Sequence, residues 1–286
     1  MSIEVIDTRF MGIERAIACH RVGDVLVDPG PASSIDHVID ALGDVVPSTV
    51  LLTHVHLDHA GGTGKLAEHF PELQVYIHAD GLPHIVDPSR LLASAERTYG
   101  EDVAKFGETI GVPAERVHPL GDGDVVAGFE AIHTPGHSGH HMAFFHLETE
   151  YVVVGDLAGQ TIHGETIMLA STPPPEVDIE LWIASIDKLA TRAPSPSTLG
   201  LAHFGRVPDA LDQLDAAKQE LRRVAELARE SSAEEFLADL EAKLEAVTPD
   251  VAESMVTALP PLAQIYAGLA RYWSKRADAV PGGESA

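Results

Sequence analysis

One short segment of the sequence concentrates side chains that bind metal ions. His54, His56, Asp58 and His59 fall within six residues, directly after the apolar run Thr49–Leu52. Neutral imidazole nitrogens and carboxylate oxygens are the donors that divalent cations such as zinc take at about 2.0–2.2 Å, and a short turn can hold several of them together. With 16 histidines among 286 residues, this string arises by chance on the order of 0.4% of the time. The segment therefore predicts a metal site.

Three further residues of suitable chemical type lie at or just past the ends of other strand-like runs. They are His137, Asp156 and His203. Any one of them alone would more often be an ordinary polar residue, so their significance comes from accompanying the first segment. Because binding and catalytic groups in layered α/β proteins commonly lie on loops at strand ends, these three are candidates to join the first four.

Short β-branched runs that end in turn residues account for most of the chain from Ile3 to about Leu201. Continuous apolar runs of this length, bounded by Gly, Pro or Asp, are typical of buried strands rather than helices. The sequence therefore predicts an α/β architecture whose strands deliver polar residues to loops. The clearest runs are Val25–Val27 before Asp28, Thr49–Leu52 before Thr53, Val75–Ile77 before His78, and Tyr151–Val154 before Gly155.

Two other parts of the chain carry helical spacing. Between about residues 80 and 118, apolar residues recur at helical intervals that Pro and Gly interrupt, which predicts a helical insertion. After Gly205 the composition shifts to Ala, Leu, Glu and Arg. We expect a first domain over residues 1–206, a C-terminal helical region over 207–278 and a disordered tail over 279–286.

The C-terminal region is predicted to hold four helices. They begin at Pro208, at Ser232 with Glu235 as a capping box, at Thr248-Pro249 and at Leu262. The first of these helices carries an apolar stripe that consists of Leu211, Leu214, Leu221, Val224 and Ala228.

Composition narrows the range of partners. The chain has 286 residues, 45% of them apolar, which is enough to enclose a sizeable core. Lys plus Arg is 19 and Asp plus Glu is 44, so the net charge is −25, and such a surface repels nucleic acid and anionic membranes. We expect a small-molecule substrate, neutral or cationic in view of the acidic surface, and no nucleic acid or membrane partner. A homodimer stays open.

Cysteine use and the first residues bear on cellular location. Cys19 is the single cysteine, so internal disulfides and thiolate metal cages are excluded. No run approaches the roughly 20 apolar residues that a membrane helix needs, and the charged residues among the first ten positions are unlike a signal peptide. These features predict a cytoplasmic protein.

Taken together, the donor segments resemble those of the metallo-β-lactamase superfamily. The resemblance covers roughly residues 1–206, which would be the catalytic domain. It implies an α/β fold, a four-layer αββα sandwich that holds two metal ions, here with a C-terminal helical extension. It rests on four segments in the family's order: His54-x-His56-x-Asp58-His59, Thr134-Pro135-Gly136-His137, Gly155-Asp156 and His203.

Carried over residue by residue, the resemblance implies two divalent ions that share one ligand. Zinc is the expected metal, with iron and manganese as alternatives. His54, His56 and His137 would bind the first ion, Asp58, His59 and His203 would bind the second, and Asp156 would bridge both.

The implied chemistry is hydrolysis by a water molecule that the two ions share. Two dications depress the pKa of such a water toward neutrality, and the hydroxide attacks the substrate carbonyl. Asp58 and Asp156 are the expected catalytic carboxylates, with Asp58 passing a proton to the departing group. We also expect Asp28 to steady the metal loops, His141 to lie behind the ligands, and His163 and Arg206 to contact substrate at the cleft edge.

Within the superfamily, the ligand set resembles glyoxalase II and the lactonases more than the true β-lactamases. Two features depart from glyoxalase II. The stretch after Asp156 lacks a Gly-Cys-Gly-Arg type signature, and no Lys or Arg occurs between Asp156 and Lys188. The predicted function is a dinuclear metal hydrolase of a small thioester, ester or lactone. A mononuclear iron persulfide dioxygenase and a non-catalytic binding protein that retains the fold are the alternatives.

Overall fold

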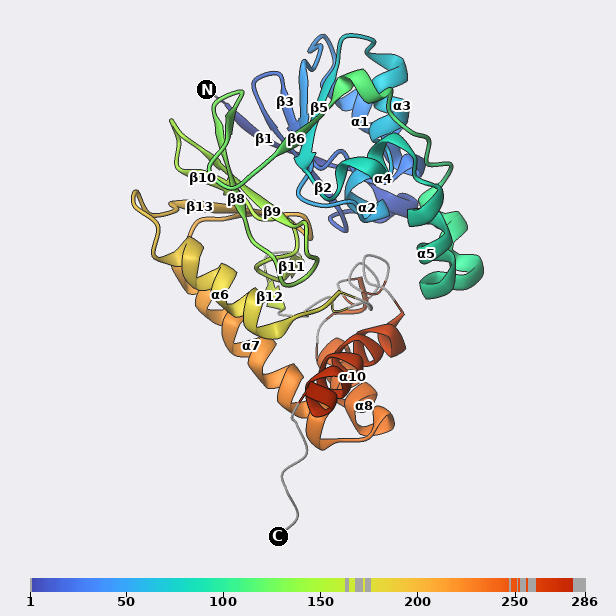
Figure 1. Cartoon of the computed structure of the whole chain (residues 1–286), viewed down its shortest axis with the longest axis vertical. Helices are drawn as coiled ribbons and strands as arrows, with labels where there is room; N and C mark the ends of the chain where they lie inside the picture. The colour runs from blue at the N-terminus through green and yellow to red at the C-terminus, as the bar shows by residue number, and fades with distance from the viewer. Residues whose placement is uncertain are drawn as a thin grey trace.

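Two six-stranded β-sheets pack face to face at the centre of the molecule (Figure 1). The structure is a computed structural model that describes residues 2–162, 165–167, 172, 176–246, 248–250, 252, 256 and 261–279. Buried side chains from both sheets, among them Val27, Leu51, Phe144 and Tyr151, fill the space between them. Helices cover the outer face of each sheet, so the expected αββα sandwich is confirmed.

The first sheet is formed by the N-terminal part of the chain. Its first three strands pair antiparallel, whereas the third to the sixth run parallel. Parallel strands end at the same edge of a sheet, which brings Asp28, after the third strand, next to Thr53, after the fourth. Across the sheet the strands are β1 (Ile3–Asp7), β2 (Ala18–Val22), β3 (Val25–Val27), β4 (Thr49–Leu51), β5 (Gln74–His78) and β6 (Val117–Leu120).

The second sheet comes from the later strands. β10 and β13 run parallel, so Asp156 and His203, which follow these two strands, also reach a common edge. The other neighbours pair antiparallel. Across the sheet the strands are β14 (Gly205–Val207), β13 (Thr198–Leu201), β10 (Tyr151–Val153), β9 (Met142–His146), β8 (Phe129–His133) and β7 (Val125–Val126), and β11 (Gln160–Ile162) pairs separately with β12 (Glu165–Ile167).

Helices between the strands of the first sheet cover its outer face. α1 (Ile35–Leu42) and α3 (Thr63–His69) bury Val38 and Leu66 against Val50 and Val75 of the sheet. Between β5 and β6 the chain is helical, as the spacing predicts. It forms α4 (Leu82–Val86), α5 (Ser89–Tyr99) and two 3-10 helices, η3 (Gly100–Phe106) and η4 (Ala114–Arg116), while η1 (Phe10–Gly12), η2 (Ala32–Ser34) and the single turn α2 (Leu57–Ala60) lie in other loops.

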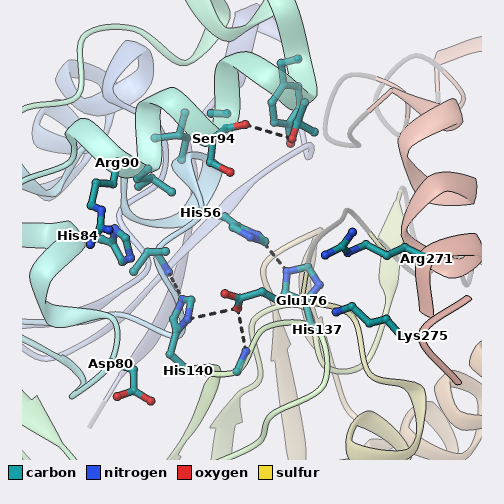
Figure 2. A pocket seen from close by; sticks show the side chains of 17 residues that line it. His56, Asp80, His84, Arg90, Ser94, His137, His140, Glu176, Arg271 and Lys275 are labelled. Carbon is teal, nitrogen blue, oxygen red and sulfur yellow. Dashed lines mark hydrogen bonds and ion pairs between the residues drawn. The ribbon is translucent and has the colours of Figure 1, made fainter. Parts of the chain in front are cut away.

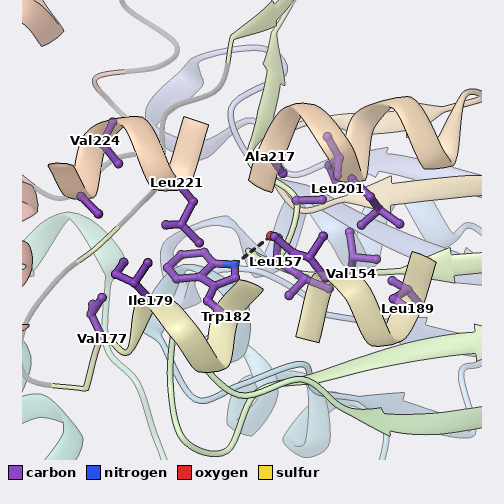
Figure 3. Packing of buried hydrophobic residues seen from close by; sticks show 14 of the residues in the cluster. Val154, Leu157, Val177, Ile179, Trp182, Leu189, Leu201, Ala217, Leu221 and Val224 are labelled. Atoms are coloured by element: carbon purple, nitrogen blue, oxygen red, sulfur yellow. Dashed lines mark hydrogen bonds between the residues drawn. The ribbon is translucent and has the colours of Figure 1, made fainter. Parts of the chain in front are cut away.

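The C-terminal helices share one hydrophobic cluster with the second sheet (Figure 3). Trp182 of α6 (Ile179–Ala190) lies against Leu221 of α7 (Ala210–Glu230) and donates a hydrogen bond from Nε1 to the carbonyl of Leu157 at 2.9 Å. α8 (Ala233–Glu245) and α10 (Leu262–Ala279) add Leu240 and Leu269 to the same cluster. None of the helices in the described part of the chain is long and apolar enough to cross a membrane.

The helical region agrees with the sequence in part. The capping box of Ser232 and Glu235 is present, and α10 begins at Leu262 as predicted. Two expectations are wrong. α7 begins at Ala210 rather than Pro208, and Leu211 is 48% exposed. Ala210 takes the buried position because it lies one helical turn before Leu214, so Leu211 points about 100° away from the buried stripe.

Two expectations for this region concern residues that the structure largely leaves undescribed. The helix predicted from Thr248-Pro249 falls mostly outside the described residues, and so does the tail after Ala279. The predicted domain boundary at residue 206 falls within β14, the edge strand of the second sheet.

Candidate metal centre

The seven expected metal ligands lie on loops that meet at one edge of the sandwich. Four of them follow β4, within or just before α2, and the other three follow β8, β10 and β13. Their donor atoms form two groups, within each of which all atoms lie no more than 4.8 Å apart. The first group is His54, His56, His137 and Asp156, and the second is Asp58, His59 and His203.

In the first group, three imidazole nitrogens and one carboxylate oxygen converge. His56 Nδ1 lies 3.0 Å from both His54 Nε2 and His137 Nε2. His137 Nε2 lies 3.4 Å from Asp156 Oδ2. A tetrahedral site with bonds of about 2.0–2.1 Å places its ligand atoms roughly 3.3 Å apart, so these separations fit one divalent cation.

The second group meets the other oxygen of the same carboxylate. His59 Nε2 and His203 Nε2 each lie 3.4 Å from Asp58 Oδ2, and they lie 3.3 Å and 3.4 Å from Asp156 Oδ1. His59 Nε2 and Asp156 Oδ1 are buried and have no hydrogen-bond partner in the described part of the chain. Buried polar atoms are normally satisfied, and a second cation would satisfy both of these. The residues therefore fit two divalent cations that share Asp156.

Asp28 orients two of the ligands from behind. Its carboxylate is buried and accepts hydrogen bonds from Thr53 N at 2.8 Å, Thr53 Oγ1 at 2.6 Å and His59 Nδ1 at 3.0 Å. Because the Thr53 hydroxyl donates to Asp28, it accepts from His54 Nδ1 at 3.0 Å. Both histidines thus hold a proton on Nδ1 and direct Nε2 toward the metal groups, where Nε2 can bind a cation once it carries no proton.

Two more histidines are oriented in the same way. His203 Nδ1 donates to the carbonyl of Ala16 at 3.0 Å, which directs Nε2 toward the second group. His141 is fully buried behind the ligands and accepts from the amide of Asp156 at 3.3 Å, so its Nδ1 donates to Thr134 Oγ1 at 2.8 Å. His141 therefore positions the bridging carboxylate through the backbone amide of Asp156.

Two glycines allow the ligand loops to approach so closely. Gly155 has φ +50°, and a Cβ there would lie 2.7 Å from both His141 Nε2 and Thr53 Oγ1. At Gly136 a Cβ would lie 2.3 Å from the Cα of Trp182, at the start of α6. A side chain at either position would push a ligand loop away from the centre.

Burial and neighbouring charges set the pKa values of the side chains in the two ligand groups. Burial lowers the pKa of His54, and it lowers that of His56 to about 3, so both imidazoles are neutral ligands at pH 7. Burial alone would raise the pKa of Asp156, but the charge of His59 beside it holds that pKa well below its ordinary value. Burial alone would lower the pKa of His203, but Asp156 raises it to about 9. Cation binding must therefore displace protons from the second group.

A cavity of about 640 Å³ opens beside the first group (Figure 2). His56 and His137 lie at its inner side, and His140, whose Nε2 accepts from the amide of Val55 at 3.2 Å, also contributes to its wall. The helices outside the sandwich supply the remaining walls. α4 and α5 provide His84, Arg90, Leu91, Ser94 and Tyr99, and α10 provides Arg271 and Lys275.

Of the two predicted substrate contacts, only Arg206 lies among the described residues. Arg206 does not line this cavity, because it lies on the edge strand β14 with its guanidinium over the ring of Tyr151, 5.7 Å from the ring centre. His163 lies outside the described residues. The cavity residues of α5 and α10 were not predicted, and the sequence offers no signal for them beyond the spacing of Arg271 and Lys275, which puts both on one helix face.

A model of the family described as "Metallo-beta-lactamase superfamily" matches residues 18–196. The hydroxyacylglutathione hydrolase of Yersinia pestis (strain Pestoides F) is 31% identical over 181 residues, which are 63% of this chain and 56% of that protein. The chain thus spans little more than half the length of this curated relative.

Two solved structures share the fold. The metallo-beta-lactamase family protein TTHA1429 from Thermus thermophilus covers 98% of this chain and 95% of its own, with a TM-score of 0.63 and 20% identity. The protein TTHA1623, solved in a di-iron-bound form, covers 68% of this chain and 91% of its own, with a TM-score of 0.51 and 26% identity. The two ligand groups, the αββα sandwich and the family match over more than half of the sequence lead to one conclusion: this chain belongs to the metallo-β-lactamase superfamily.

Proposed function

We propose that the protein is a dinuclear metal hydrolase that cleaves a small thioester, ester or lactone. The observation that carries this proposal is the position of Asp156, which turns one carboxylate oxygen toward each ligand group. The similarity to a hydroxyacylglutathione hydrolase over 63% of the chain supports an acyl substrate. The cavity beside His56 and His137 is large enough for a small molecule.

The ligand set suits zinc, and we propose zinc as the metal, with iron and manganese as alternatives. Imidazole and carboxylate donors without thiolate are compatible with all three. His54, His56, His137 and Asp156 would hold one ion, and Asp58, His59, His203 and Asp156 the other. Two such ions supply an activated water at neutral pH and polarise a carbonyl oxygen.

The chain's own residues supply orientation and proton transfer. Asp58 turns Oδ2 toward His59 and His203, and its side chain is 12% exposed, which makes it the most accessible ligand of the second group. We assign to Asp58 the transfer of a proton to the leaving group. Asp28 and His141 keep the ligands in position from behind, where no substrate reaches them.

The complete second group argues against the two alternatives. A mononuclear iron persulfide dioxygenase would not need Asp58, His59 and His203 gathered around a second oxygen of Asp156. A non-catalytic relative would have no reason to retain both groups with their supporting hydrogen bonds.

Metal analysis followed by a substrate panel tests the proposal. Protein loaded with zinc, iron or manganese should bind two equivalents and hydrolyse at least one thioester, ester or lactone, with phosphodiesters as the negative comparison. Less than one equivalent of metal together with no hydrolysis after loading would reject the proposal. One equivalent of iron with oxygen uptake on a thiol persulfide would select the dioxygenase instead.

A further inference from the structure

The cavity beside the metal centre differs in charge from the rest of the chain. Acidic residues outnumber Lys and Arg by 44 to 19 in the sequence. Among the 17 residues that line the cavity, the cations Arg90, Arg271 and Lys275 outnumber the carboxylates Asp80 and Glu176. The net charge of the whole chain, on which the expectation of a neutral or cationic substrate rests, therefore differs in sign from the balance of Lys and Arg over Asp and Glu in the cavity lining.

We propose that Arg271 and Lys275 bind a carboxylate of the substrate and so select anionic acyl substrates. This inference rests on the proposed hydrolase function and names its substrate class. The two residues lie four positions apart on α10, so they project from the same face of the helix. Both are exposed side chains, and Figure 2 shows them extending from α10 toward His137, with Arg90 and Ser94 across the cavity.

Contacts on the rest of α10 hold this face toward the cavity. Ile265 and Leu269 are buried in the cluster shared with the second sheet. Tyr272 donates to the carboxylate of Glu180 on α6, and Trp273 Nε1 donates to the carbonyl of Ala225 on α7 at 2.7 Å. Ile265, Leu269, Tyr272 and Trp273 thus anchor the helix.

A third cation of α10 has a different role. Arg276 forms an ion pair with the same Glu180 carboxylate, so it contributes to the anchoring of the helix. Arg271 and Lys275 line the cavity instead, where an arginine can present two parallel N–H groups to one carboxylate and a lysine adds a point charge.

α10 lies outside the part of the chain that the family model matches. The family model ends at residue 196, and α10 begins at Leu262. The long-range field of the −25 chain does not oppose this local binding, because at physiological salt charges further than about 8–10 Å from the cavity are largely screened.

Matched substrates with and without a carboxylate test the inference. We suggest the propionyl and succinyl thioesters of 2-mercaptoethanol and the propionyl thioester of 3-mercaptopropionate. The fully metal-loaded protein should prefer one of the two anionic compounds by about tenfold in kcat/KM. Which one it prefers tells whether α10 lies on the acyl side or the leaving-group side of the scissile bond.

Variants connect this preference to α10. In the double variant Arg271→Gln, Lys275→Gln the preference should disappear through a rise in KM with kcat unchanged, because the carboxylate is bound equally in the ground state and the transition state. The control is Arg222→Gln, which removes one positive charge from an exposed position on α7 and should keep the preference. Equal hydrolysis of neutral and anionic thioesters, or a preference that survives in the double variant, would overturn the inference while the hydrolase function stands.

A binding measurement decides the case without turnover. Calorimetric titration of the metal-loaded protein with 3-phenylpropionate and with its neutral amide should show tighter binding of the carboxylate. That binding should be about tenfold weaker in the double variant and unchanged in Arg222→Gln. If the carboxylate binds the double variant as it binds the original protein, the metal ions rather than α10 hold it and the inference is wrong. If no thioester, ester or lactone is hydrolysed although two metals are bound, the proposed function fails and the titration still tests α10.

Discussion

The substitution Asp28→Asn tests whether the hydrogen bonds behind the ligands control the metal centre. Asp28 is 1% exposed and its two oxygens accept three hydrogen bonds, from Thr53 N, Thr53 Oγ1 and His59 Nδ1. Asparagine has the same shape but only one acceptor oxygen. It also tolerates the left-handed backbone at this position, where φ is +52°, so backbone strain should not contribute.

The expected cost follows from counting the bonds. If the amide oxygen of the asparagine replaces Oδ2, it still accepts the hydrogen bonds from Thr53 Oγ1 and His59 Nδ1. The NH₂ group of the asparagine then faces the Thr53 amide, so one hydrogen bond is lost. The opposite orientation loses two. Because a hydrogen bond to a charged group contributes about 1.5–3 kcal/mol, we expect the free energy of unfolding of the metal-free protein to fall by at least about 1.5 kcal/mol. Affinity for the cation held by His59 should fall about 10- to 100-fold.

Urea denaturation of the metal-free protein and chelator competition for each cation measure the two effects. Asp44→Asn is the control, because Asp44 is exposed and lies just after α1 rather than on a ligand loop. If Asp28→Asn and Asp44→Asn had the same unfolding free energy and the same two cation affinities as the original protein, Asp28 would be an ordinary turn residue. His54 and His59 would then not depend on Asp28 for their orientation.

Three further predictions concern the centre itself. Replacing His56 by alanine removes a ligand of the first group, so metal content should fall toward one equivalent and hydrolysis should drop by more than about 100-fold; unchanged turnover would exclude His56 from the site. Gly155→Ala places a methyl group about 2.7 Å from His141 Nε2 at a positive φ, so we expect a loss of about 2–4 kcal/mol in urea denaturation, and a loss below about 0.5 kcal/mol would contradict the close packing. Although burial alone would lower it, Asp156 raises the pKa of His203 from its ordinary 6.5 to about 9 in the metal-free protein. The contribution of His203 to the free energy of unfolding is therefore complete below about pH 6.5 and is lost as the pH rises through about 9. Cation affinity should increase over the same interval, because fewer protons have to be displaced. A melting temperature of the metal-free protein that rises between these pH values would refute the predicted loss of stability.

Much of the fold could be predicted because its signals are local. The runs before Asp28 and Thr53 match β3 and β4 to within a residue, since a buried strand needs only a few consecutive apolar residues and a turn. The capping box at Ser232 is equally local. Leu211 was misplaced because the rotation of α7 is set by what the helix packs against, and that partner lies far away in the sequence.

The ligand loop after β4 could also be predicted from a local signal. His54 to His59 place four donors on one turn, and few structural roles other than metal binding require such crowding. The supporting groups were less accessible to sequence reasoning. The orientation of His141 depends on the amide of Asp156 and on Thr134, a combination that only the pairing of strands creates.

By itself, then, the amino-acid sequence determined the chemistry of the centre, because donor type is a property of each side chain and the crowding of donors is a property of neighbouring residues. The tertiary structure alone decided the charge of the cavity. Arg90 and Arg271 are far apart in the sequence and become opposite walls of one pocket only because α5 and α10 pack on either side of His56 and His137. A net charge summed over the whole chain contains no information about that placement, since a substrate experiences mainly the charges within about one Debye length.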